Sequence, residues 1–151
     1  MPTTNCGRRM NISHILLTLF FPLLYLLAAE PIDNQNPLYR CTTKSKKVVE
    51  LKKQDDKIFY NFGSPNQPPE LEIKKSSHEV EISMGNLSGN ELSNSVSLTN
   101  GAYTYTVIMK INRIAETQEP EHGIIVKKNS RYLAYIPCIA NSVQGSLLDF
   151  E

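Results

Sequence analysis

The chain has 151 residues, with 16 basic and 15 acidic side chains, three cysteines and no tryptophan. Because the basic and acidic groups nearly balance, the sequence gives no reason to expect a nucleic acid or an anionic membrane surface as partner. The length suits a single domain rather than several.

The first 29 residues predict an export signal. Arg8 and Arg9 form a basic start, Ile15–Leu27 is an apolar run, and Ala28 and Ala29 are small residues before a polar stretch. The run is shorter than the roughly 20 residues that a membrane-spanning helix needs. We therefore expect cleavage near Ala29 by the general secretory route and no membrane span afterwards. An uncleaved N-terminal anchor is the alternative, and the paired arginines also suggest twin-arginine export, which the residues after them fit poorly.

Cleavage would change both the charge and the cysteine count. It removes two arginines and no acid, so 14 basic groups remain against 15 acidic ones. Cys6 leaves with the signal, and Cys41 and Cys138 remain in an oxidising compartment, where a disulfide between them is predicted. Closing a loop of about 100 residues is worth up to roughly 4.7 kcal/mol in the chain-entropy treatment.

The mature chain alternates polar and apolar residues with period two and has no long segment of helical period. A flexible leader is expected at residues 30–37. Strands are expected at residues 38–43, 47–52, 57–63, 95–99, 102–111, 123–127 and 131–136, and residues 80–84 alternate in the same way. The strongest hairpin signal is Asn100-Gly101. The sequence therefore predicts one all-β domain over residues 38–151, an antiparallel meander of about eight strands forming a small barrel or sandwich. The tail, residues 139–151, is expected to form a turn of helix or to lie along the barrel.

The sequence contains no recognisable catalytic constellation. It has no Gly-x-Ser-x-Gly signature, and its two mature cysteines are expected to be oxidised. The clusters His78-Glu79-x-Glu81 and Glu119-x-Glu121-His122 lack the spacing that converges on one metal ion, so we interpret them as a solvated loop or strand face. No phosphate-binding loop or dinucleotide fingerprint occurs. We expect no enzyme activity, no metal and no cofactor.

Recognition is expected at tyrosines or at polar loops. Tyr103 and Tyr105 share one face of a strand, which is either a core wall or an exposed aromatic strip. The segments Gly85–Asn90 and Ala115–His122 are predicted loops, where binding residues tend to lie, although both could be plain linkers. The candidate binding residues are therefore Tyr103, Tyr105, Gly85, Asn86, Asn90, Glu119, Glu121 and His122.

Four short motifs carry a resemblance to known proteins. They are Tyr39-x-Cys41, Ile58-x-Tyr60-x-Phe62-Gly63, Asn100-Gly101-x-Tyr103-x-Tyr105 and the late Cys138. Together they resemble a recurrent group of small exported proteins of Gram-negative bacteria that have no assigned activity, which implies the periplasm or the exterior as location. The early Tyr-x-Cys is also similar to periplasmic C-type lysozyme inhibitors, which are small disulfide-tied barrels. Their inhibitory Ser-Gly-x-x-Tyr loop has no counterpart in Thr99-Asn100-Gly101-Ala102-Tyr103, which argues against direct lysozyme inhibition.

We expect a non-enzymatic protein that binds another periplasmic or envelope protein, as an inhibitor or an immunity factor against a cell-envelope hydrolase. One alternative is an envelope module that binds a small ligand or a glycan. Another is an unrecognised hydrolase. A deep apolar pocket would favour the ligand, whereas a flat exposed aromatic patch beside a protruding loop would favour the protein partner. The oligomeric state is left open.

Overall fold

The computed structural model describes residues 37–150 together with Met1. The predicted export signal and nearly all of the predicted leader lie outside the described residues. Residues 37–150 form ten strands and three short 3-10 turns. None of the described residues belongs to a helix long and apolar enough to cross a membrane.

Every strand pair in the described domain is antiparallel, and the strands form two five-stranded sheets. The first sheet has the order β10-β1-β2-β3-β4, and its strands are β1 (Tyr39–Thr42), β2 (Val48–Gln54), β3 (Lys57–Gly63), β4 (Leu71–Ser76) and β10 (Gln144–Gly145). The second has the order β5-β6-β7-β8-β9, and its strands are β5 (Glu81–Ser88), β6 (Glu91–Asn100), β7 (Tyr103–Asn112), β8 (Glu121–Lys128) and β9 (Arg131–Pro137). A 3-10 turn, η1 (Ser77–Glu79), leads from one sheet to the other.

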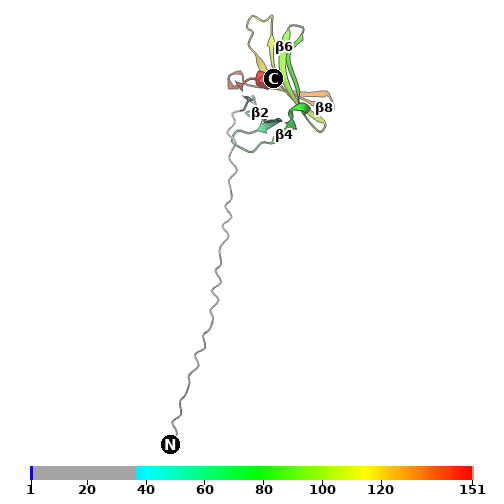
Figure 1. Cartoon of the computed structure of the whole chain (residues 1–151). Coiled ribbons are helices and arrows are strands. Elements are labelled where there is room, and N and C mark those ends of the chain that lie inside the picture. The colour runs from blue at the N-terminus through cyan, green and yellow to red at the C-terminus, as the bar shows by residue number, and fades with distance from the viewer. Residues whose placement is uncertain (2–36, 151) are drawn as a thin grey trace. The chain divides into compact units, whose positions relative to one another are not determined.

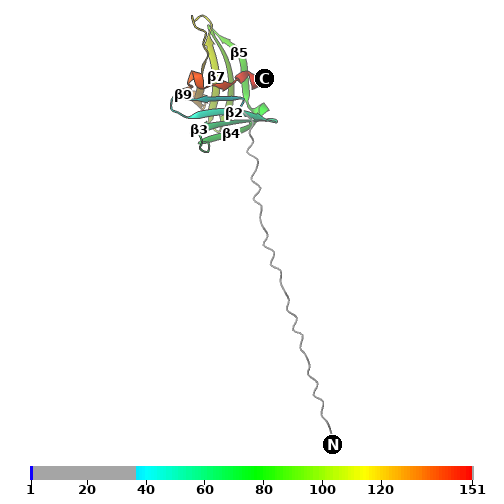
Figure 2. The same ribbon diagram turned by 90° about the vertical axis from the view of Figure 1, so that its left-hand side faces the viewer.

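The two sheets pack face to face as a sandwich. Figure 1 shows the cyan and teal strands of the first sheet beside the green to orange strands of the second. In Figure 2 the strands of the first sheet run across those of the second. Both sheets contribute fully buried side chains to one core, for example Leu51 and Tyr60 from the first and Val96, Val107 and Ile124 from the second. The prediction of an all-β domain is therefore confirmed, and of its two alternatives the sandwich fits, because neither sheet closes on itself.

The tail adds to both the sheet and the core. After η2 (Ala140–Ser142), β10 pairs with β1, and the turn η3 (Leu147–Phe150) buries Leu147 and Phe150. Gly145 has φ +75°, and a side chain there would meet the Leu38 carbonyl, so only glycine suits this close approach.

Two predicted boundaries are wrong. The segment Gly85–Asn90 is mostly strand, because β5 continues through a bulge to Ser88 and only Gly89 and Asn90 form the turn into β6. The second predicted loop ends earlier than expected, since β8 already includes Glu121 and His122. The end of β5 is exposed at a sheet edge, so it needs no alternating apolar residues, and the usual sequence signal is missing there. By contrast, the Asn100-Gly101 hairpin is confirmed between β6 and β7.

A disulfide between Cys41 and Cys138 joins β1 to the residue that follows β9, with the two Cα atoms 5.9 Å apart. Backbone bonds reinforce it on both sides. The Ile139 N–H donates to the Thr42 carbonyl at 2.8 Å, and the Lys44 N–H donates to the Pro137 carbonyl at 3.3 Å. This predicted bridge is confirmed, and it fixes the end of the second sheet against the first.

Replacing both Cys41 and Cys138 by serine should lower the free energy of unfolding by up to about 4.7 kcal/mol, because the bridge closes a loop between residues 97 apart. Urea unfolding of the oxidised protein, the reduced protein and the double-serine variant measures this. Reductant should shift the wild-type midpoint and leave that of the serine variant unchanged. Equal midpoints for oxidised and reduced wild type would contradict the prediction.

Candidate functional site

The predicted pair Tyr103 and Tyr105 lies on the inner face of β7. The Tyr105 ring packs against the core, with its centroid 5.6 Å from that of Tyr60 and 6.4 Å from that of Tyr103. The Lys128 ammonium covers Tyr103 at 5.1 Å. Burial raises the pKa of Tyr60, and the charge interaction with Tyr105 raises it further. Of the two alternatives for this pair, the geometry favours the core wall.

Gly85, Asn86 and Asn90 belong to the β5–β6 hairpin. The Gly85 N–H donates to the Asn94 side-chain oxygen at 2.7 Å, and Asn90 accepts a backbone bond from Arg113 at 2.8 Å. These bonds hold the bulge and the turn, and none of the three residues lines the hollows described below.

Glu119, Glu121 and His122 do come together, in a cleft of about 520 Å³ between the loop 113–120 and the end of β9. Lys44, Tyr135 and Cys138 line the same cleft. The loop thus meets the disulfide and the β1–β2 turn, a juxtaposition that the sequence alone did not reveal. The other acidic cluster, around His78, is exposed on and beside η1, as its interpretation as a solvated face predicted.

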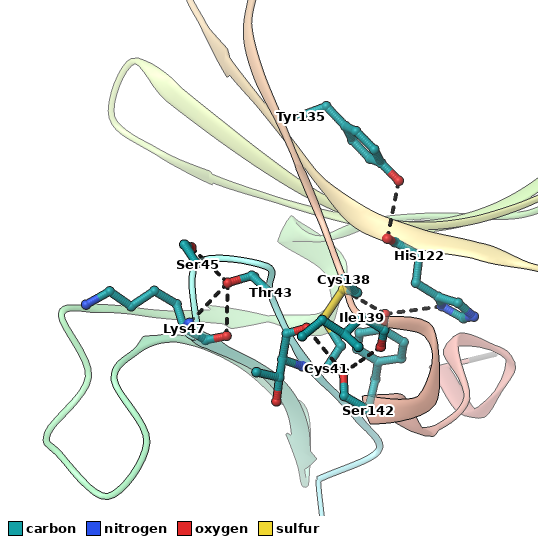
Figure 3. Close-up of a disulfide and its surroundings, with 11 residues drawn as sticks. Cys41, Thr43, Ser45, Lys47, His122, Tyr135, Cys138, Ile139 and Ser142 are labelled. Atoms are coloured by element: carbon teal, nitrogen blue, oxygen red, sulfur yellow. Dashed lines mark hydrogen bonds between the residues drawn. A yellow bond between two sulfur atoms is a disulfide. The ribbon is translucent and has the colours of Figure 1, made fainter.

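His122 was interpreted as part of a solvated stretch, but it is half-buried at the floor of the cleft. Its ring stacks on Tyr39 with centroids 5.9 Å apart, and a hydrogen bond of 3.2 Å joins its Nδ1 to the Tyr39 hydroxyl. Its carbonyl accepts bonds from the Cys138 N–H at 2.9 Å and from the Tyr135 hydroxyl at 3.2 Å. Figure 3 shows Tyr135 reaching this carbonyl from one side while the ring points to the other. Burial lowers the pKa of His122, so the neutral imidazole is favoured.

Tyr135 connects this cleft with the outer face of the second sheet, and the sequence analysis did not single it out. Its ring lies across Gly123 on the neighbouring strand, where an added Cβ would come within 2.6 Å of the Tyr135 hydroxyl oxygen. The sequence signal for this contact is Gly123 itself, because a glycine inside a strand often marks a place where another group comes close to the backbone.

A second, shallower hollow of about 190 Å³ lies on the other side of Tyr135. Ile108, Ile125 and Tyr132 line it, and Lys110 lies at its edge. The Lys110 ammonium is 3.3 Å from Glu91, 3.6 Å from Glu121 and 5.9 Å from the centre of the Tyr135 ring. Burial acts to lower the pKa of Lys110, but the bond with Glu91 and the two carboxylate charges raise it overall. Burial also raises the pKa of Tyr135.

Four large apolar side chains on β9 and on the segments at its end are exposed. Tyr132 and Leu133 on β9 are 64% and 52% exposed, Ile114 on the loop is 71% exposed, and Ile139 after the disulfide is 39% exposed. Within residues 37–150 only two other large apolar side chains, Leu87 and Leu148, are comparably exposed. These four residues and Tyr135 line the length of β9 and the segments at its end, and they are called the β9 surface below (Ile114, Tyr132, Leu133, Tyr135 and Ile139).

The chemistry offered by this region is apolar contact and hydrogen bonding. Among residues 37–150 no group of three or more His, Cys, Asp or Glu side chains is placed to hold a metal ion. The two cysteines of the described domain are joined in the disulfide, so neither supplies a thiolate.

No protein-family model matches the chain, and comparisons with curated proteins and with solved structures find no match. The resemblance to small exported proteins of Gram-negative bacteria therefore stays a prediction.

The buried position of His122 predicts a pH-dependent stability. Because its pKa is lowered in the folded state, the unfolded chain binds this proton more readily, and stability falls as pH drops. The loss should begin near the unfolded pKa of about 6.5 and be complete below the folded-state pKa. Melting temperatures at about pH 7.5 and about pH 5 should differ less in His122→Gln than in the wild type. His78→Gln, an exposed control, should behave like the wild type. Equal pH dependence in all three proteins would refute this role of His122.

Gly123 should be required for the position of Tyr135. A Gly123→Ala change should cost about 1–3 kcal/mol, because its Cβ overlaps the Tyr135 ring. In a double-mutant cycle by urea unfolding, most of that cost should disappear when Tyr135 is also alanine. An additive cycle would mean that the ring does not lie across Gly123.

Proposed function

We propose that this protein acts in the periplasm or outside a Gram-negative cell by binding another envelope protein, and that it catalyses no reaction. The observation that carries the proposal is the concentration of exposed apolar side chains on the β9 surface. Four of the six large apolar side chains that are exposed within residues 37–150 lie there, and such a concentration among polar groups is typical of a protein interface. Tyr132 and Leu133 lie near the start of β9, whereas Ile114 and Ile139 lie near its end, so the exposed apolar side chains extend along the whole strand.

Recognition would depend on side chains rather than on strand addition. β9 is an edge strand, but Pro137 has no N–H, and its carbonyl already accepts a bond from Lys44. A bulge between Val126 and Lys127 also shifts the register between β8 and β9. Both features make an edge a poor template for an added strand.

Two exposed carboxylates on the loop 113–120 give the Ile114 end of this surface an acidic character, whereas Lys128 and Arg131 lie beside Leu133 at the other end. Glu116 and Glu119 are exposed, and neither forms an ion pair within residues 37–150. Such rim charges speed association with a basic partner more than they add affinity. We therefore infer a partner with basic groups around an apolar depression. An envelope hydrolase, with this chain as its inhibitor or immunity factor, is the class that we favour.

The rigid position of the surface supports the same role. Ile139 follows the disulfide directly, and its N–H is bonded to the first sheet. Tyr135 is held by the close approach of Gly123 and by the His122 carbonyl. Side chains fixed before binding lose less entropy when the partner arrives, so more of the contact energy appears as affinity.

The test uses matched serine variants. Immobilised protein should retain a partner from an envelope extract of the source organism, and the purified partner should then bind it in a surface-binding assay. Ile114→Ser with Ile139→Ser should weaken this binding by about tenfold or more, the equivalent of about 1.4 kcal/mol. Leu87→Ser, an equally exposed residue on β5, should leave it unchanged.

Two outcomes would count against the proposal. If the Leu87 and the Ile114/Ile139 variants bind alike, the β9 surface is not the interface. If no partner is retained and the purified protein turns over members of an ester or glycan substrate panel, the chain is a hydrolase rather than a binding protein.

A further inference from the structure

The outer face of the second sheet has two halves of different chemistry. Over β6 and β7 it is made of hydroxyl side chains in opposed pairs. Ser97 and Thr106 are 2.8 Å apart, and Thr99 and Thr104 are 3.3 Å apart. Further along the same register Ser95 lies opposite Ile108, where the face becomes apolar.

The apolar half contains the hollow of about 190 Å³. Ile108 and Ile125 lie on neighbouring strands, and Tyr132 and Tyr135 line the hollow from β9. The hollow is open to solvent, so a ring can lie in it while the rest of a longer ligand extends over the neighbouring strands.

Ion pairing at the edge of the hollow restricts the charge of a ligand. Lys110 is bonded to Glu91 and lies close to Glu121, so a carboxylate or phosphate ligand would have to displace these partners. An aliphatic chain would cover the charged groups without offering them hydrogen bonds, which is costly. A neutral ligand with hydroxyl groups avoids both penalties, because its hydroxyls can accept from the Lys110 ammonium and donate to the carboxylates.

A sugar ring combines these requirements. One face of a pyranose presents C–H groups that can contact Ile125 and the tyrosine rings, while its rim carries hydroxyls. Neighbouring sugar units would then extend over the Ser and Thr pairs of β6 and β7, which both donate and accept hydrogen bonds.

We propose that this hollow, with the adjoining hydroxyl rows, is a binding site for a neutral glycan, one pyranose ring of which contacts Tyr132 and Tyr135. The site overlaps the β9 surface at these two tyrosines, and glycan binding does not require a protein partner to be bound there. Glycan binding here would keep the protein on an envelope polysaccharide while the loop 113–120 and Ile139 stay free for a partner.

The test is a titration of the isotope-labelled protein with neutral oligosaccharides, namely the N-acetylglucosamine tetramer, cellotetraose and maltotetraose. Galacturonic acid trimer serves as the anionic comparison. At millimolar concentrations at least one neutral oligomer should shift the backbone amide signals of Ile108, Ile125 and Tyr132. Tyr132→Ala should weaken that binding about tenfold or more. Phe59→Ala should not, because Phe59 is a half-buried aromatic residue of the first sheet, beneath Lys74.

A second pair of variants tests whether glycan binding and protein binding depend on different residues. Ile114→Ser with Ile139→Ser should retain the full glycan response, whatever it does to a protein partner. If Tyr132→Ala proves misfolded by its amide spectrum, Tyr132→Leu replaces it and should also bind more weakly. The proposed glycan site would be refuted if no neutral oligomer caused shifts, or if the shifts were confined to other surfaces. It would also be refuted if only the anionic trimer bound, or if the tyrosine variant bound with unchanged affinity.

Discussion

The C-terminal part of the described domain is fastened at two points to its first strand, β1. Cys41 is bonded to Cys138 after β9, and Tyr39 pairs with Gly145 in β10. The N–H of Ser146 also donates to the carbonyl of Leu38, at 2.9 Å. A chain of this length buries a modest core, so a covalent closure at this point restricts the unfolded chain considerably. The join also brings the loop 113–120, β9 and the β1–β2 turn to one end of the sandwich.

The polar side chains beside the disulfide form hydrogen bonds with one another, so they can be buried and held in fixed positions. Tyr39 is fully buried, and its hydroxyl is bonded to the His122 ring. Burial raises the pKa of Tyr39 and lowers that of His122, so both side chains favour their neutral forms. A neutral pair can stay in a largely apolar interior without the cost of a buried charge. His122 therefore lines the cleft as a neutral side chain that Tyr39 holds in place.

The sequence predicted what depends on local patterns and missed what depends on contacts across strands. The Asn100-Gly101 turn and the long strand after it are encoded in adjacent residues, and the disulfide followed from counting cysteines after export. The bulge at Gly85 and the buried position of His122 depend on neighbours far along the chain, which no local pattern reports. Tyr135 lies in the predicted strand 131–136, but nothing nearby in sequence shows that its ring covers Gly123.

Residues on the solvent-facing side of a sheet do not pack in the core. Apolar residues on that side therefore need an explanation other than core packing. On the outer face of the second sheet, Ser97 and Thr106 show that hydroxyl residues suit these positions. Ile108 and Ile125 lie on the same face, away from the core. The fully buried residues of β6, β7 and β8 alternate with them on the inner face, so core packing does not account for the two isoleucines. The proposed glycan contact would account for them, and Tyr135 lines both this hollow and the cleft beside the loop.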